Sequence, residues 1–495
     1  MLAGLVRRMR ACVLALIGLA SLAYGSQALA ESPWLKTETP RFILYSNGSE
    51  QTLRDYAVRL ELLDATFWEV YGLPRPPPPP RKLPIYLVTD TSMLREVSPN
   101  LSSSTAGFYS AGAGEVFAMG LARRGNDYVL LHEYVHHLMM QNFPFGYPAW
   151  FIEGYAEYFM ETTVNESTIK VGLATGRAQG LALEQWLPMQ ELLSKRVSDI
   201  PDSKRGTFYA QSWLLTHYLV SDPTRAKQLQ AYLTAIGEGQ KSVEALETAT
   251  GIPTDAWQRR LMTYLTSQMP YVQFKRTQFP KTEVEVTRLS PAMSDLLLDD
   301  LHVRSEVSPE FRAALLARIR AKAANYPDDV FARTALARAE VAIGDPAAAV
   351  PILKRLLTDN PKDVEALAIE AQRLMALGDK TPARRADLYN QAGSILAVAF
   401  KLDPKRYQTL FEFAHSRSGE ANYPSDNTLT ALLSALKLAP QVGEIRLESA
   451  QGLMRRARSR EAALLLAPLA NNPHDSDLAK RAQDLLKQIA DAKTP

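Results

Sequence analysis

The pattern of apolar and polar residues divides this chain into an N-terminal part that mixes strands with helices and a C-terminal part that is helical throughout. Residues 41–45 and 83–88 are short apolar runs typical of buried strands. Between them, residues 49–71 place apolar side chains at helical spacing. This β-α-β order predicts that residues 31–90 begin an α+β domain.

Prolines recur at nearly regular intervals in the last third of the chain, at Pro327, Pro361, Pro404, Pro440 and Pro473. Successive intervals are 34, 43, 36 and 33 residues, and each interval has room for two helices. This period resembles that of tetratricopeptide repeats, which stack into a concave surface suited to a protein or peptide partner. We therefore predict an all-α tetratricopeptide-like solenoid at residues 309–495, preceded by a linker at 271–308. A plain helical bundle is the alternative.

The first thirty residues have the pattern of a secretory signal peptide. Three arginines between positions 7 and 10 precede an apolar run at residues 11–25, and Ala28-Leu-Ala30 gives the small-x-small cleavage motif. A retained membrane anchor is the rival interpretation, but a spanning helix needs roughly 20 apolar residues. We predict cleavage after Ala30, so that the mature chain lies in the periplasm or outside the cell without a stable membrane anchor.

Composition restricts the chemistry that the mature chain can use. The single cysteine, Cys12, lies within the predicted signal peptide. Its removal would exclude structural disulfides, a cysteine nucleophile and cysteine-ligated zinc. Any metal site must therefore use histidines and carboxylates. The net charge is only +3, with Lys and Arg dispersed, so nothing indicates a nucleic-acid partner.

Three of the seven histidines occur together, in the segment His-Glu-Tyr-Val-His-His that starts at His132. Residues 128–140 contain neither glycine nor proline, which predicts a helix. On that helix His132 and His136 lie one turn apart on the same face, so both imidazoles can bind one Zn²⁺ ion. Glu133 lies beside them and is placed to take a proton from an attacking water.

A catalytic zinc needs a third protein ligand, and the best candidates lie in Pro148-Ala-Trp-Phe-Ile-Glu-Gly-Tyr-Ala-Glu-Tyr158. Pro148 suits the first turn of a helix, on which Glu153 and Glu157 would share one face. One carboxylate can bind zinc while the other accepts the N–H of a ligating imidazole. Gly154 is expected to let the two helices of the site approach closely. Trp150 is expected to pack in the core beneath them.

These two segments resemble the gluzincin (peptidase MA-like) metallopeptidases, including the aminopeptidase N family with its HExxH and WLNEGFAEY-type segments. The resemblance assigns the third zinc ligand to Glu153 and the supporting carboxylate to Glu157. Residues 207–213, Thr-Phe-Tyr-Ala-Gln-Ser-Trp, are similar to the segment that carries the family's transition-state tyrosine. Tyr209 would then donate to the oxyanion of the tetrahedral intermediate. The resemblance covers about residues 40–270.

Two features depart from that family. Sixteen residues separate His136 from Glu153, fewer than in the aminopeptidases, so Glu157 stays open as an alternative ligand. The GxMEN segment that holds the substrate's free amine is absent, and the nearest stretch is Phe117-Ala-Met-Gly120. The resemblance therefore implies zinc chemistry without aminopeptidase specificity.

Two further histidines adjoin the predicted site. His137 points away from the ligand face and is interpreted as structural. His217 lies eight residues after Tyr209 on the same predicted helix and could replace it as oxyanion donor, although a structural role is the simpler interpretation.

Together these patterns predict an α+β zincin-like catalytic domain followed by the tetratricopeptide-like solenoid. Residues 31–90 would be the β-α-β part of the domain and residues 91–270 its zinc-binding part. The expected function is an exported zinc metallopeptidase that hydrolyses peptide bonds, with repeats that recruit a protein partner or substrate. The alternative is a catalytically silent scaffold that holds metal without turnover. A peptidoglycan or glycan hydrolase with Glu153 and Glu157 as paired carboxylates is a third interpretation.

Overall fold

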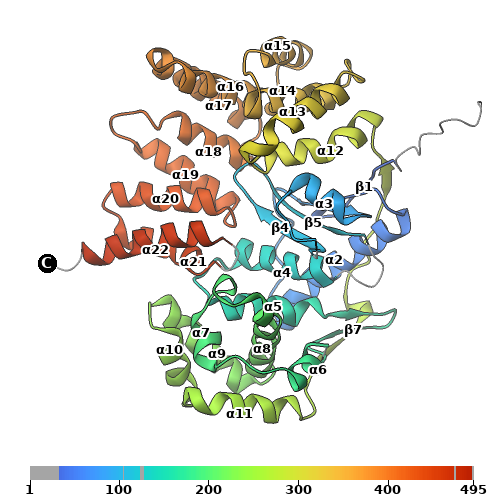
Figure 1. Ribbon diagram of the computed structural model, residues 1–495, viewed down its shortest axis with the longest axis vertical. Helices are drawn as coiled ribbons and strands as arrows, with labels where there is room; N and C mark the ends of the chain where they lie inside the picture. The colour runs from blue at the N-terminus through green and yellow to red at the C-terminus, as the bar shows by residue number, and fades with distance from the viewer. Residues whose placement is uncertain (1–32, 104, 123–127, 175, 473–474, 493–495) are drawn as a thin grey trace, which may run out of the picture.

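The computed structural model describes residues 33–103, 105–122, 128–174, 176–472 and 475–492. The predicted signal peptide at residues 1–30 lies outside these ranges. Within them, no helix is both long and apolar enough to cross a membrane. Figure 1 shows a mixed α/β unit, residues 33–288, beside a helical array that continues to residue 492.

A six-stranded sheet forms the centre of the first half of the α/β unit. In spatial order its strands are β4 (Gly107–Ala111), β5 (Val116–Leu121), β3 (Leu83–Val88), β2 (Phe42–Ser46), β1 (Leu35–Glu38) and β9 (Val286–Arg288). The neighbours β5, β3 and β2 pair in parallel, whereas β4, β1 and β9 are added through antiparallel pairs. The two strands predicted at 41–45 and 83–88 are therefore confirmed, and β4 is the outermost strand of one edge.

Helices cover both faces of this sheet because its inner strands carry apolar side chains on alternate sides. Ile85 and Leu87 of β3 belong to a core shared with α2 (Glu50–Val70) and α4 (Tyr128–Asn142). Tyr86 and Val88 belong to the opposite core, shared with α3 (Thr91–Val97) and α12 (Pro291–Arg304). The helix α4, which carries the histidine motif, thus lies on a rigid sheet.

The segment 271–308, predicted as a linker, contains regular structure. The small second sheet consists of β6 (Thr163–Val164), β7 (Thr168–Val171) and β8 (Val272–Lys275). From the same segment, β9 pairs with β1, and α12 buries Leu297 and Leu301 against the main sheet. The two parts of the chain are therefore joined through packed structure and not through an extended connection.

The second half of the α/β unit is helical, with α5 at its centre. Its helices are α5 (Ala149–Met160), α6 (Gly176–Leu183), α7 (Met189–Ser194), α8 (Asp202–Val220), α9 (Pro223–Gly237), α10 (Ser242–Thr250) and α11 (Thr254–Leu265). Every residue of α5 is buried, and α8 packs along it.

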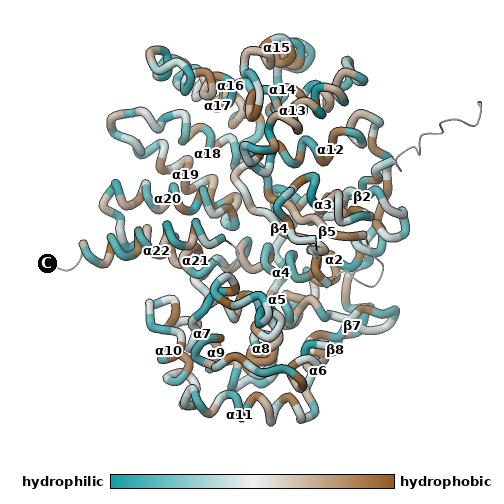
Figure 2. The backbone as a smooth tube through the Cα atoms, viewed as in Figure 1, coloured by the Kyte–Doolittle hydropathy of each residue, from teal (hydrophilic) through white to brown (hydrophobic). Residues whose placement is uncertain are grey.

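The helical array consists of α12 followed by further helices in a regular series. These are α13 (Pro309–Ala323), α14 (Val330–Ile343), α15 (Ala349–Asp359), α16 (Val364–Lys380), α17 (Arg385–Leu402), α18 (Tyr407–Ser416), α19 (Asp426–Leu438), α20 (Gly443–Arg455), α21 (Ser459–Ala470) and α22 (Ser476–Asp491). Helices α14, α16, α18 and α20 each begin three residues after one of the recurring prolines; Pro473 lies outside the described residues. In Figure 2 their residues alternate between hydrophobic and hydrophilic, as expected of helices with one buried face. The predicted solenoid is confirmed.

Apart from α12, which packs side-on against the main sheet, the array meets the α/β unit with the ends of its helices, on the side where the recurring prolines lie. Tyr407 and Gln408, at the start of α18, donate to backbone oxygens of the β4–β5 turn at 3.4 and 3.2 Å. Beyond the end of α21, Asn471 Nδ2 donates to the backbone oxygen of Gly146 at 3.1 Å. Figure 1 shows these helix ends against the α/β unit and the opposite ends pointing away from it. The contact therefore uses one edge of the array.

Glu412 on α18 predicts a pH-dependent stability of the array. Its Oε1 accepts from Gln372 Nε2 at 2.7 Å, and its Oε2 is buried without a hydrogen-bond partner among the described residues. Burial raises the pKa of Glu412 from 4.5 to about 7, against the opposing charge of Arg406. The unfolded chain therefore loses this proton first, and stability falls as the pH rises from about 4.5 to 7.

Glu412→Gln, which is neutral at every pH, should stabilise the protein relative to the wild type at pH 8 by about 1–3 kcal/mol. At pH 4 both side chains are neutral, so the two proteins should differ little. Denaturant unfolding at the two pH values measures this difference. An equal difference at both would show that Glu412 ionises normally in the folded protein.

Candidate metal centre

The histidine motif lies on α4, which is held from both sides. Leu131, Val135 and Leu138 are buried in the core beneath the main sheet. Tyr134 Oη donates to Asp64 Oδ1 of α2 at 2.5 Å. Because the helix is fixed by apolar packing and by this buried hydrogen bond, the direction of its histidine face is fixed as well.

The glutamates come from α5, whose apolar residues also match the sequence analysis. Trp150 is fully buried and its Nε1 donates to Tyr232 Oη at 2.9 Å. Phe151 is 5% exposed. Trp150 therefore packs in the core, as predicted, and Phe151 packs there as well. The helix starts after Pro148 and presents Glu153 and Glu157 on the side that faces α4.

Gly154 does permit a close helix contact, but with α8 and not with α4. A Cβ atom at this position would lie 2.2 Å from the backbone oxygen of Ser212 and 2.4 Å from Thr216 Oγ1. From the sequence, the close approach was expected between the two helices that carry the predicted ligands. The structure corrects this, because α4 and α5 meet through side chains whereas α8 lies directly against the α5 backbone at Gly154.

Gly154→Ala should therefore destabilise the protein, because the new methyl group meets a helix backbone that cannot rotate away. We expect a loss of about 3 kcal/mol, the upper part of the range for overpacked cores. Gly206→Ala on α8 is the matched control, since its Cβ would meet nothing within 4 Å. Denaturant unfolding compares them, and equal stabilities would contradict the close contact.

Three predicted ligand residues converge at one point. His132 Nε2 lies 3.2 Å from Glu153 Oε2 and 3.0 Å from His136 Nε2, and His136 Nε2 lies 3.4 Å from Glu153 Oε2. The side chains are almost completely buried, with exposures of 9%, 4% and 0% for His132, His136 and Glu153. Among the described residues this is the one group of histidines and acidic residues with the spacing of a metal site.

The electrostatics of this group favour a positive charge at its centre. Burial lowers the pKa of His132, but the hydrogen bond with Glu153 and the charges of Glu153, Glu157 and Glu133 outweigh it and raise the pKa to about 9. A buried group of carboxylates around two imidazoles is costly unless a cation or a proton compensates it. The donor set therefore suits a cation.

Glu157 approaches the same imidazole from the other side. Its Oε1 lies 3.6 Å from His132 Nδ1, whereas the three converging atoms include His132 Nε2. Its carboxylate also receives two hydrogen bonds from Arg177, Nε to Oε2 and Nη2 to Oε1, both at 2.8 Å. Glu157 thus lies beside His132, a predicted ligand, and outside the group of three. Arg177 was not anticipated from the sequence, because a single arginine in a polar segment carries no distinguishing pattern.

Glu133 and Tyr209 border the group. Glu133 is half-buried and adjoins His132 on α4. Tyr209 is half-buried on α8, with its ring centroid 6.1 Å from that of His132. Burial, with the charges of Glu153, Glu133 and Glu157, raises the pKa of Tyr209 above 10. Its hydroxyl therefore remains a donor at neutral pH.

The other two histidines have structural contacts. His137 Nδ1 lies 3.0 Å from Tyr109 Oη of β4, and burial lowers the pKa of His137 to about 4. His217 Nε2 lies 2.8 Å from the backbone oxygen of Gly172, and its Nδ1 lies 2.9 Å from Tyr264 Oη. With both ring nitrogens engaged, His217 has no contact with the group of three, so its contacts support the structural interpretation.

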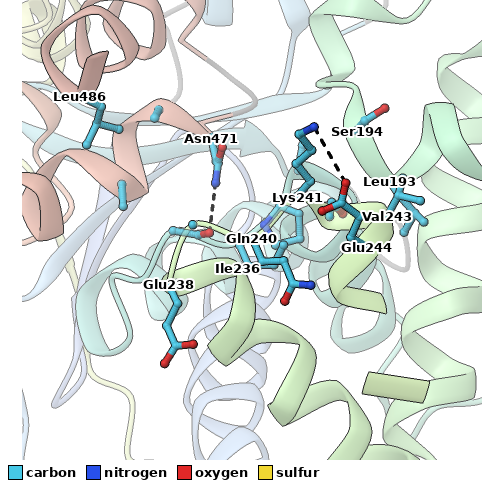
Figure 3. Close-up of a pocket in the computed structure, with 18 of the residues that line it drawn as sticks. Leu193, Ser194, Ile236, Glu238, Gln240, Lys241, Val243, Glu244, Asn471 and Leu486 are labelled. Carbon is cyan, nitrogen blue, oxygen red and sulfur yellow. Dashed lines mark hydrogen bonds and ion pairs between the residues drawn. The ribbon is translucent and has the colours of Figure 1, made fainter. Parts of the chain in front are cut away.

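A separate pocket of about 850 Å³ lies at the seam between the α/β unit and the array. Figure 3 shows Leu193 of α7 and Val243 of α10 on one side, and Asn471 and Leu486 of the array on the other. Its lining residues do not include the three that converge on α4 and α5. The seam pocket and the candidate metal centre are therefore distinct features.

The similarities to known proteins concern the helical array. A tetratricopeptide repeat family matches residues 330–377, which comprise α14, α15 and most of α16. The comparison with curated proteins found no match. Among solved structures, a thermophilic tetratricopeptide repeat protein of Thermus thermophilus is 24% identical, with a TM-score of 0.31 over 36% of this chain and 91% of its own.

Two structures of MamA are similar over a comparable share of the chain. MamA of MSR-1 is 14% identical, with a TM-score of 0.26 over 40% of this chain and 97% of its own. A double mutant of MamA of RS-1 is 15% identical, with a TM-score of 0.26 over 41% and 97%. These TM-scores are too low to support a conclusion. The family match and the recurring prolines both indicate tetratricopeptide repeats. The C-terminal part of this chain contains tetratricopeptide repeats.

Proposed function

We propose that this protein is a zinc-dependent peptidase that hydrolyses peptide bonds. The observation that carries the proposal is the buried convergence of His132, His136 and Glu153, with Glu133 beside them. Support also comes from the gluzincin-like sequence of the two helices, α4 and α5, that supply these residues. A zincin-like fold for the α/β unit, residues 33–288, is part of this proposal.

The donor set fits zinc. Two imidazole nitrogens and one carboxylate oxygen are the ligands of many catalytic zinc sites, which leave a fourth position open. Ligands at about 2.0–2.1 Å in a tetrahedral site lie roughly 3.3 Å from one another. The three donor atoms here are 3.0–3.4 Å apart. When bound, zinc would supply Lewis-acid polarisation of the scissile carbonyl.

The remaining steps fall to side chains of this chain. Glu133 takes a proton from the attacking water and returns it to the leaving amine. Tyr209 donates a hydrogen bond to the carbonyl oxygen as it gains negative charge. Among the described residues β4 pairs with a strand on one side only, so its outer edge could pair with an extended peptide. Glu157 Oε1, which lies 3.6 Å from His132 Nδ1, favours a proton on that nitrogen and so keeps Nε2 available as a ligand atom.

Two further parts of the proposal concern location and partners. The pattern of residues 1–30 supports export to the periplasm or the cell exterior, with cleavage after Ala30. The tetratricopeptide repeats support recruitment of a protein substrate or partner, since such arrays generally bind proteins or peptides. A catalytically silent scaffold, which holds metal without turnover and acts through its repeats, is the alternative that this match favours.

The glycan-hydrolase interpretation has less support. Paired catalytic carboxylates must flank a substrate bond. Glu153 and Glu157 are 0% and 2% exposed, and both face His132. Their surroundings suit a ligand and its supporting partner better than an acid and a nucleophile.

The test uses the purified chain from residue 31 onward. We expect one equivalent of zinc by mass spectrometry and cleavage of casein or of a broad peptide library. Chelation should abolish cleavage, and zinc should restore it. A protein that holds full zinc and cleaves nothing would favour the silent scaffold, and a protein without zinc would contradict both.

A further inference from the structure

We propose that Arg177 is a positioning residue that holds the supporting carboxylate and the oxyanion donor of the metal centre in register. The inference rests on the proposed function. Arg177 lies in the first turn of α6, and α6 packs beside α8 (Figure 1). Its guanidinium contacts Glu157 and Tyr209, and through these two side chains it can influence the three converging residues.

The contact with Glu157 is a two-point clamp. Nε and Nη2 of Arg177 each donate to a different carboxylate oxygen at 2.8 Å. The Glu157 side chain is 2% exposed, whereas that of Arg177 is 34% exposed. A bidentate guanidinium–carboxylate pair fixes the plane of the carboxylate as well as its position. Arg177 therefore prevents Glu157 from rotating about its last torsion angle.

This restraint reaches the metal centre because one oxygen of Glu157 serves two partners. Oε1 accepts from Arg177 Nη2 at 2.8 Å and lies 3.6 Å from His132 Nδ1. A carboxylate held there favours the His132 tautomer that is protonated on Nδ1. The lone pair is then on Nε2, the nitrogen that faces Glu153 and His136.

The same guanidinium also lies against Tyr209. Arg177 Cζ is 5.7 Å from the centroid of the Tyr209 ring, which in turn is 6.1 Å from the His132 ring. A cation over an aromatic ring at this distance is attractive. One arginine therefore restrains both a residue that supports a zinc ligand and the residue proposed to stabilise the transition state.

The test measures zinc affinity and kinetics in the full mature chain. Arg177→Gln should weaken zinc binding about 10-fold in a chelator competition, the lower end of the range for losing a ligand's outer partner, because Glu157 itself remains. Arg177→Lys keeps the positive charge but cannot form the bidentate pair, so it should recover part of the lost zinc affinity. At saturating zinc, Arg177→Gln should lower kcat more than it changes KM, because Tyr209 acts in the transition state.

Arg320→Gln is the matched control. Arg320 lies in the repeat array and also makes a bidentate pair with a buried glutamate twenty positions away. Its Nε and Nη2 donate to the two carboxylate oxygens of Glu340 at 2.6 and 2.8 Å. The Arg320→Gln variant should have the zinc affinity and the kcat of the wild type. If Arg177→Gln binds zinc as tightly as the wild type, the inference about Arg177 is wrong, whether or not the variant loses as much thermal stability as the control. That result would leave the proposed function intact. A wild type that binds no zinc would overturn the proposed function first.

Discussion

Glu133→Gln should retain one equivalent of zinc and lose peptide hydrolysis by about 10²–10⁴-fold in kcat/KM, the usual contribution of a general base. The amide has nearly the shape of the carboxylate but cannot take a proton from water. Glu133 is outside the three converging side chains and is half-buried, so its replacement should leave their geometry intact. Metal analysis and steady-state kinetics on one peptide cleaved by the wild type measure both effects.

Glu191→Gln provides the control for that substitution. Glu191 lies on α7 of the same α/β unit and pairs with Lys195 at 2.6 Å on the surface. Its kinetics should match the wild type. Wild-type hydrolysis by Glu133→Gln would remove Glu133 from the mechanism, whereas loss of zinc together with activity would show that Glu133 supports metal binding instead.

The elements that the sequence predicted well are those set by local patterns. The strand at residues 83–88 and the α4 helix follow from apolar spacing and from the absence of glycine and proline. The repeat register follows from proline, which cannot continue a helix and so marks the turn before each new pair. For the candidate site, the spacing of His132, His136 and Glu153 already placed them on helix faces that could meet.

The features that the sequence did not predict depend on contacts between distant segments. Arg177 clamps Glu157 only because α6 folds back beside α8. Gly154 faces α8 because the chain returns across α5 some fifty residues later, and no periodicity records which face a later helix will cover. The same reason explains α12, whose leucines cover a sheet face completed by strands from residues 35–121.

Glu153→Gln and Glu157→Gln should separate the third ligand from its supporting partner. Glu153 Oε2 lies within 3.4 Å of both converging imidazole nitrogens, so an uncharged amide there removes the one carboxylate among the three converging residues. Glu157 contacts the other nitrogen of His132, and its loss should weaken zinc binding roughly 10–100-fold. We expect Glu153→Gln to weaken zinc binding by more than 100-fold, so that the protein is purified without zinc.

Chelator competition on the two variants and the wild type gives the order of the effects. Circular dichroism should confirm that both variants fold, because each substitution replaces a buried carboxylate with an amide of the same size. The reverse order, with Glu157→Gln devoid of zinc and Glu153→Gln only weakened, would make Glu157 the ligand. His132 would then have to turn its Nδ1 toward the metal, and the Arg177–Glu157 clamp would have to open before zinc could bind.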